Sequence, residues 1–220
     1  MEIRHDALMY QRLGSLIYQD GIIAFFKVDK SNVILSPLII AFSHHLADIL
    51  PFSHIKIQTF LQLLWLGLAQ FLLYKILILM KIHRNIIMAV ILYFGFSPAI
   101  VNSSLSSWPE ILTYPLILGI VLLSYLSWDK VQTGKIKDMF VYGFSLAAVF
   151  FAISIAREVY EYVVLIYLFF YFIFLLKFIK ERQFKHLIRG LILLLTIFSL
   201  YQAFVTPYKL LNYKYVGYKS

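Results

Sequence analysis

The sequence predicts an all-α, multi-pass membrane protein, and three observations support this fold class. The 220 residues are 61% hydrophobic and only 14% charged, whereas soluble domains are usually ~45–50% apolar and ~25% charged. The apolar residues gather in long runs close to the ~20 residues that an α-helix needs to cross a bilayer. The basic residues gather between alternate runs. The dominance of leucine, isoleucine, phenylalanine and valine also excludes a disordered chain.

Six apolar runs approach the length of a membrane span. Two of them are short, but loops frame each one. The predicted spans are Ile57–Met80, Ile86–Val101, Pro109–Trp128, Asp138–Ile155, Val159–Ile179 and Leu187–Val205. The chain therefore divides into external juxtamembrane helices at 1–56, a transmembrane helical bundle at 57–205 and an external tail at 206–220.

The loops between these spans differ sharply in charge. Ten Lys and Arg residues lie in the loops that follow the first, third and fifth spans, and the two alternate loops hold only Arg157. Because Lys and Arg mark cytoplasmic loops, we expect the three basic loops to be cytoplasmic and both chain ends to be external. The net charge of +9 then belongs to a membrane protein, and no nucleic-acid partner is expected.

Two amphipathic helices are predicted before the first span. Residues 7–26 are interrupted by polar residues and place Met9, Leu13, Leu16 and Ile17 on one face, as in a helix that lies in the membrane interface. Residues 37–50 are too few for a span. Ser36 and Pro37 suit the start of this second helix. Its apolar stripe consists of Leu38, Phe42, Leu46 and Ile49.

The residue types limit the chemistry that this chain can perform. It has no cysteine, which excludes disulfides, thiolate metal sites and a cysteine nucleophile. His44 and Asp48 are four residues apart on a helix, a spacing that suits metal ligands, but the adjacent His45 points in another direction. We therefore predict no metal site.

The acidic residues favour the predicted external side, which holds eight of the eleven. Asp6 either caps the first helix or takes part in chemistry. Glu110 either interacts with the dipole of its helix or acts as a second functional carboxylate. Arg157 either forms a weak surface ion pair with Glu158 or binds a phosphate, whose geometry suits a guanidinium.

Several short motifs follow one another along the chain. Asp6, Tyr10 and Gly21 mark the first amphipathic helix, and Ser36-Pro37-Leu38 opens the second. A Ser-rich loop then precedes Glu110, and Arg157-Glu158 follows the next hairpin. This order resembles the N-terminal portion of the GT-C superfamily of membrane glycosyltransferases. That superfamily includes the protein O-mannosyltransferases and the aminoarabinose transferases of lipid A.

The resemblance implies transfer of a sugar from a polyprenyl-phosphate donor to a glycan, lipid or protein acceptor outside the membrane. Asp6 would be the general base or would orient the acceptor, and Glu110 would be the second carboxylate. Arg157 would bind the donor phosphate, with Tyr10, His44 and Glu158 lining the pocket. A divalent cation held by Glu110 is the one cofactor that the resemblance allows. The membrane would be the plasma membrane in a bacterium and the endoplasmic reticulum in a eukaryote.

Two other functions remain open. A small transporter or channel component would suit six spans, although its polar groups should lie near mid-membrane. A non-catalytic membrane fragment is the second alternative, because the chain starts inside the first external loop of the proteins it resembles. We therefore expect a truncated member of that superfamily.

Overall fold

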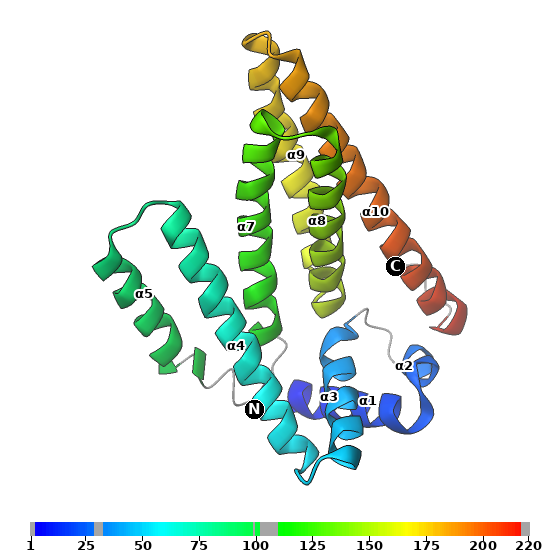
Figure 1. The fold of residues 1–220 in the computed structure, drawn as a ribbon. Helices are drawn as coiled ribbons and strands as arrows, with labels where there is room; N and C mark the ends of the chain where they lie inside the picture. The colour runs from blue at the N-terminus through cyan, green and yellow to red at the C-terminus, as the bar shows by residue number, and fades with distance from the viewer. Residues whose placement is uncertain (1–2, 29–32, 99, 102–109, 217–220) are drawn as a thin grey trace.

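The computed structural model describes residues 3–28, 33–98, 100–101 and 110–216, and the regular structure of these ranges is α-helical. Long helices pack side by side in a bundle, and three shorter helices gather at one end of it (Figure 1). The predicted fold class, an all-α multi-pass membrane protein, is confirmed.

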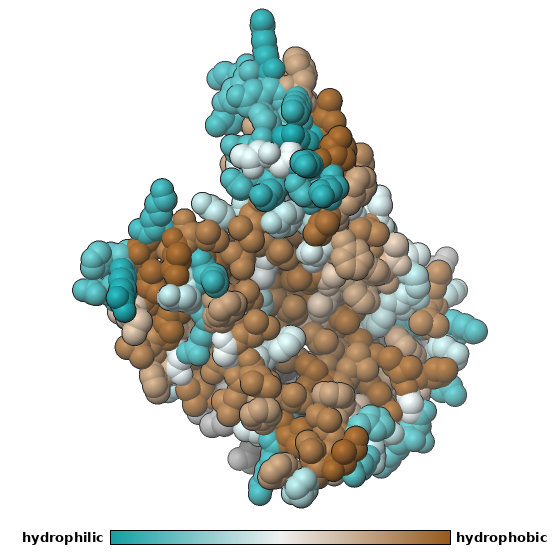
Figure 2. Space-filling model, viewed as in Figure 1, coloured by the Kyte–Doolittle hydropathy of each residue, from teal (hydrophilic) through white to brown (hydrophobic). Residues whose placement is uncertain are grey.

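Five helices in the described ranges are long and apolar enough to cross a membrane. Each overlaps a predicted span. They are α4 (His54–Leu79), α7 (Glu110–Thr133), α8 (Ile136–Ala156), α9 (Tyr160–Lys180) and α10 (Phe184–Val216). Figure 2 shows apolar surface over the middle of the bundle and hydrophilic surface at the tip formed by α9 and α10. This distribution suits a lipid environment around the middle of the bundle.

The span predicted at Ile86–Val101 is wrong in its length. Helix α5 (Arg84–Phe96) has 13 residues, which at 1.5 Å per residue reach about 20 Å, less than the ~30 Å hydrocarbon core. The cause is Pro98. A proline disfavours helical geometry in the residue before it, and Ser97 has an extended backbone (φ −60°, ψ 122°).

Helix α10 runs past the predicted end of its span at Val205. It continues to Val216 with Pro207 inside it. The additional turns contact helix α2 (Ile22–Val28), because the ring of Phe26 packs edge-on against Tyr208 with 5.5 Å between centroids. Residues 206–216 are therefore a helical extension that joins the bundle to the N-terminal helices.

The main core of the bundle is formed by α7, α8, α9 and α10. Its fully buried side chains include Val131, Met139, Phe150, Leu175 and Leu193. A polar contact inside it joins Ser154 of α8 to Tyr201 of α10, with 2.9 Å between the hydroxyl oxygens.

Helices α4, α5, α7, α8, α9 and α10 alternate in direction, so the turns after α4, α7 and α9 lie at the same end of the bundle (Figure 1). We call this the basic end, and its turns are residues 80–83, 134–135 and 181–183. Helices α1, α2 and α3 and the turn at 157–159 lie at the other end, which we call the α1–α3 end. The predicted grouping of the basic loops at one end of the bundle is thus present in the fold.

Two turns at the basic end share an unusual backbone. Lys81 and Arg182 have φ values of 56° and 57°. Each follows a helix whose last carbonyls are satisfied as in a Schellman motif, with Gln183 N–H donating to Phe178 O (2.8 Å) after α9. Glycine is the usual residue at this position, because a left-handed backbone is unfavourable for other residues.

Replacing Arg182 by glycine will therefore stabilise the protein by about 1 kcal/mol, since it removes the penalty of a left-handed residue with a Cβ. Thermal unfolding in detergent measures the effect. Arg182→Ala removes the same charge and keeps the Cβ, so it should give no gain. Equal melting temperatures for the two variants would contradict the assignment of strain to this turn.

The predicted interfacial helix at 7–26 is two helices. Helix α1 (Ile3–Asp20) ends at Gly21, whose φ of +81° turns the chain into α2. Helix α1 buries Tyr10, Leu13 and Ile17 against its neighbours. The predicted face is thus present at Leu13 and Ile17, but Met9 is exposed.

Helix α3 (Leu35–Ile49) lies against α1 with a different face from the one predicted. A Cβ added at Gly14 of α1 would lie 2.5 Å from the Cβ of Ile40, so the two helices approach closely there. This close approach buries the side of α3 that carries Ile40 and Ala41. Half of the predicted apolar stripe faces outward instead, with Phe42 53% and Ile49 81% exposed, whereas Leu38 and Leu46 are partly buried.

The start of α3 also differs from the prediction. The cap position is Ile34, and no side chain caps the helix there. Ser36 and Pro37 lie within the first turn and are buried. Because the helix already begins at Leu35, Ser36 lies inside it and cannot serve as the cap.

Candidate functional site

The two predicted catalytic carboxylates belong to helices at the same end of the bundle. Asp6 lies near the start of α1, and Glu110 is the first residue of α7. Both helix starts lie at the α1–α3 end (Figure 1). The side chains of Asp6 and Glu110 are outside the described part of the structure, so their roles stay predictions.

Helix α4 connects the helices that carry these two residues. Gln11 of α1 donates a hydrogen bond from Nε2 to Oε1 of Gln58, at 2.8 Å. Trp65 donates from Nε1 to the carbonyl oxygen of Leu112, in the first turn of α7, at 3.0 Å. The first turns of α4 therefore hold α1 and α7 in fixed positions.

Buried polar side chains lie close to these contacts. Gln58 and Gln62 of α4 are 5% and 6% exposed, and Thr113 of α7 is 3% exposed. The sequence analysis did not single out these residues. The signal was present, because Gln58 and Gln62 are one helical turn apart in a largely apolar span. Polar residues inside spans are costly and often functional.

Tyr10, a predicted pocket residue, is buried in a small cluster with Val33 and Ile40. It follows Asp6 by one turn of α1 and precedes Gln11, which bonds to α4. Its position is thus next to the contact between α1 and α4.

His44, the second predicted pocket residue, lies in a stack of rings between α1, α3 and α4. Its ring centroid is 4.0 Å from that of His54 and 5.0 Å from that of Tyr18, with both pairs stacked. Its Nε2 atom is 3.4 Å from the hydroxyl oxygen of Ser15. Burial lowers the pKa of His44, and the neighbouring His54 adds to this effect.

The lowered pKa of His44 predicts that acid destabilises the α1–α3 end. The folded state favours neutral His44, so its contribution to stability is full above the unfolded pKa of 6.5 and is lost as the pH falls through the lowered folded value. The pKa of His44 also responds to the charges of His45, Asp48 and His54. Between pH 7.5 and pH 5 the melting temperature should fall less in His44→Phe than in the unmodified protein, because phenylalanine keeps a ring but cannot titrate. An equal loss in both proteins would contradict this role.

Asp48 is engaged by Tyr18, whose hydroxyl lies 3.0 Å from both carboxylate oxygens. This hydrogen bond and the negative charge raise the pKa of Tyr18. Among the residues that the structure describes, no group of three or more His, Asp and Glu side chains is placed to bind a metal ion. His44 and Asp48 both contact Tyr18, the first by ring stacking and the second by accepting its hydrogen bond.

A groove runs along α1 beside this stack. Its volume is about 880 Å³, and Gln11, Arg12, Ser15, Gln19 and His54 contribute its polar lining. These side chains alternate with Leu8, Met9 and Leu16. The groove therefore offers both polar and apolar contacts.

Arg157, the predicted phosphate ligand, ends α8 at the α1–α3 end. Its backbone N–H donates to Ile153 O (3.1 Å), and its side chain is half-buried, whereas Glu158 is exposed. Glu161, one turn later, pairs with Lys209 of α10 at 2.6 Å. The sequence analysis missed Lys209, because this contact depends on the extension of α10 beyond Val205.

A cavity of about 520 Å³ surrounds the Glu161–Lys209 pair between α9 and α10. Tyr201, Gln202, Thr206 and Tyr213 add polar groups to its wall. The structure thus brings Tyr10, His44, Arg157 and Glu158 to one end of the bundle. Two separate hollows lie at this end, the groove along α1 and the cavity between α9 and α10.

No family model, curated protein or solved structure matches the chain. The functional assignment therefore depends on the residues and their positions.

Proposed function

We propose that this protein is a membrane glycosyltransferase that uses a polyprenyl-phosphate-linked sugar. The supporting observation is the concentration of buried polar side chains, Gln58, Gln62 and Thr113, where α1 and the start of α7 meet α4. Asp6 and Glu110 belong to these same two helices. Arg157 lies at the same end of the bundle, away from the basic turns.

The proposed reaction assigns one task to each charged residue. The acceptor hydroxyl oxygen bonds to the anomeric carbon of the donor, and the bond from that carbon to the phosphate oxygen breaks. Asp6 takes the hydroxyl proton as general base. Polyprenyl phosphate leaves with the bonding electrons, and Arg157 stabilises its charge through charge-assisted hydrogen bonds. Glu110 is the second carboxylate, and Tyr10, His44 and Glu158 shape the pocket.

The reaction site belongs to the external face of the membrane in this proposal. Lys and Arg mark the opposite end of the bundle as cytoplasmic. The membrane is the plasma membrane if the protein is bacterial and the endoplasmic reticulum if it is eukaryotic.

Donor turnover by the purified protein tests this proposal. The protein is reconstituted in liposomes with a radiolabelled polyprenyl-phosphate sugar, and release of polyprenyl phosphate is followed with and without added divalent cations. Release above that of protein-free liposomes supports a transferase. Uptake of a solute without cleavage of any donor would replace the proposal with a transporter.

A further inference from the structure

A further hollow of the molecule lies on the outer side of α7 and α9. It is a groove of about 770 Å³. Its lining includes Tyr125 and Trp128 from α7 and Ile166, Phe170, Phe174 and Lys177 from α9. The wall is almost entirely apolar, so it suits a hydrocarbon chain.

Contacts between aromatic rings keep the two walls of the groove in place. Trp128 stacks on Phe178 with 5.4 Å between ring centroids, and it meets Tyr171 and Phe174 edge-on at 5.7 Å and 6.2 Å. Ser124 of α7 also donates a hydrogen bond to the hydroxyl of Tyr167, at 3.1 Å. The groove is therefore formed before a ligand arrives.

The groove is long enough to hold a lipid chain through one leaflet. Along α9 its lining runs from Val163 to Lys177, and at 1.5 Å per residue this distance is about 21 Å. One leaflet contributes roughly 15 Å of hydrocarbon, half of the ~30 Å core. A chain that enters beside Lys177 can thus follow the groove through its own leaflet.

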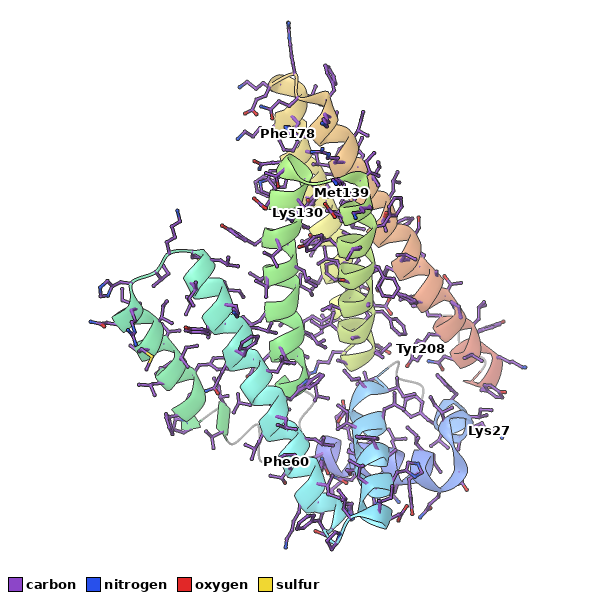
Figure 3. The ribbon with its side chains drawn as sticks, viewed as in Figure 1. Lys27, Phe60, Lys130, Met139, Phe178 and Tyr208 are labelled. Carbon is purple, nitrogen blue, oxygen red and sulfur yellow. The ribbon has the colours of Figure 1, made fainter. Side chains whose placement is uncertain are left out.

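Charge at the mouth of the groove selects the head group. Lys177 lines the groove and is exposed, and its partner Glu181 is 3.5 Å away. Lys130 and Lys180 end α7 and α9 at the same end of the bundle, where Figure 3 labels Lys130 and Phe178. A nearby carboxylate, Asp138, is already occupied because it accepts the backbone N–H of Lys135 at 2.8 Å. The surplus of positive charge favours an anionic head group.

We propose that this groove binds one acyl chain of an anionic glycerophospholipid from the leaflet at the basic end, with its phosphate beside Lys177. The site is independent of the proposed glycosyl transfer, because the donor site lies at the α1–α3 end. Its occupant is a lipid of the bilayer and is not consumed.

Quenching of Trp128 fluorescence by brominated acyl chains tests the proposal. The chain has three tryptophans, so Trp65→Phe and Trp108→Phe leave Trp128 as the only emitter. In liposomes, brominated phosphatidylglycerol should associate with Trp128 about five-fold more strongly than brominated phosphatidylcholine, the factor expected for one basic residue near an anionic lipid. Lys177→Gln should remove this preference.

Lys75→Gln is the matched control, because Lys75 is also exposed and lies near the same end of α4, over the ring of Phe71 at 5.4 Å. It should leave the preference intact. Because Trp65 also bonds to Leu112, native mass spectrometry of the protein with its tryptophans intact gives a second measurement. Retention of phosphatidylglycerol should fall in Lys177→Gln and not in Lys75→Gln. Equal quenching by both lipids, or equal retention by both variants, would overturn the proposal.

Discussion

Asp6→Asn will abolish sugar transfer and leave the fold intact. Asparagine keeps the size of the side chain, but it cannot accept the proton of an acceptor hydroxyl at neutral pH. Loss of a general base typically reduces a rate by about 10²–10⁴-fold. Donor turnover in liposomes measures the loss, and thermal unfolding verifies the fold.

Asp20→Asn is the matched control for this variant. Asp20 ends the same helix and is exposed, so its replacement should leave turnover unchanged. Full turnover by Asp6→Asn would remove Asp6 from the mechanism. A parallel loss of melting temperature in Asp6→Asn would instead indicate a structural role for Asp6 within α1.

Arg157→Ala will weaken use of the polyprenyl-phosphate donor. Hydrogen bonds to charged groups contribute ~1.5–3 kcal/mol, so kcat/KM for the donor should fall by about 10- to 100-fold. Arg157→Lys should recover part of the loss, because lysine keeps the charge but not the two-pronged geometry of a guanidinium. Steady-state kinetics over a range of donor concentrations measures both variants.

A structural role for Arg157 predicts a different pattern. It would lower the melting temperature of Arg157→Ala and leave the dependence on donor concentration unchanged. The Glu161–Lys209 pair offers a comparison, because Glu161 lies one turn after Arg157. Lys209→Gln should reduce donor use less than Arg157→Ala does, and the reverse order would assign the phosphate to the cavity between α9 and α10.

The long helices could be predicted because hydropathy and charge act locally along the chain. Each of the five long apolar helices overlaps a predicted span, and their turns carry the expected basic residues. The failure at α5 was also local, since Pro98 signals the end of a helix. The extension of α10 could not be predicted from local sequence. It depends on packing of Tyr208 against Phe26, a residue far away in the sequence.

The N-terminal helices show why an apolar stripe does not identify the buried face near a membrane. In water the larger apolar face would turn inward, but lipid can cover Phe42 and Ile49 equally well. Close approach of Gly14 to Ile40 selects the buried face of α3 instead.

The candidate site could be predicted only in outline. Order along the sequence indicated that Asp6, Glu110 and Arg157 belong to one end of the bundle, and the three backbone positions lie there. The buried partners Gln58, Gln62 and Thr113, and the pairing of Glu161 with Lys209, depend on how separate helices meet. Such contacts leave only a weak signal in a single sequence.

The orientation of the bundle is the claim on which every proposed role depends, and single-cysteine labelling measures it directly. The native chain has no cysteine. Val159 and Gln183 are both exposed and lie in turns at opposite ends of the bundle. In intact cells, or in sealed microsomes of known orientation, Val159→Cys should react with a membrane-impermeant maleimide only from the external or lumenal side. Gln183→Cys should react only from the cytoplasmic side. Labelling of both from one side, or the reverse assignment, would contradict the account.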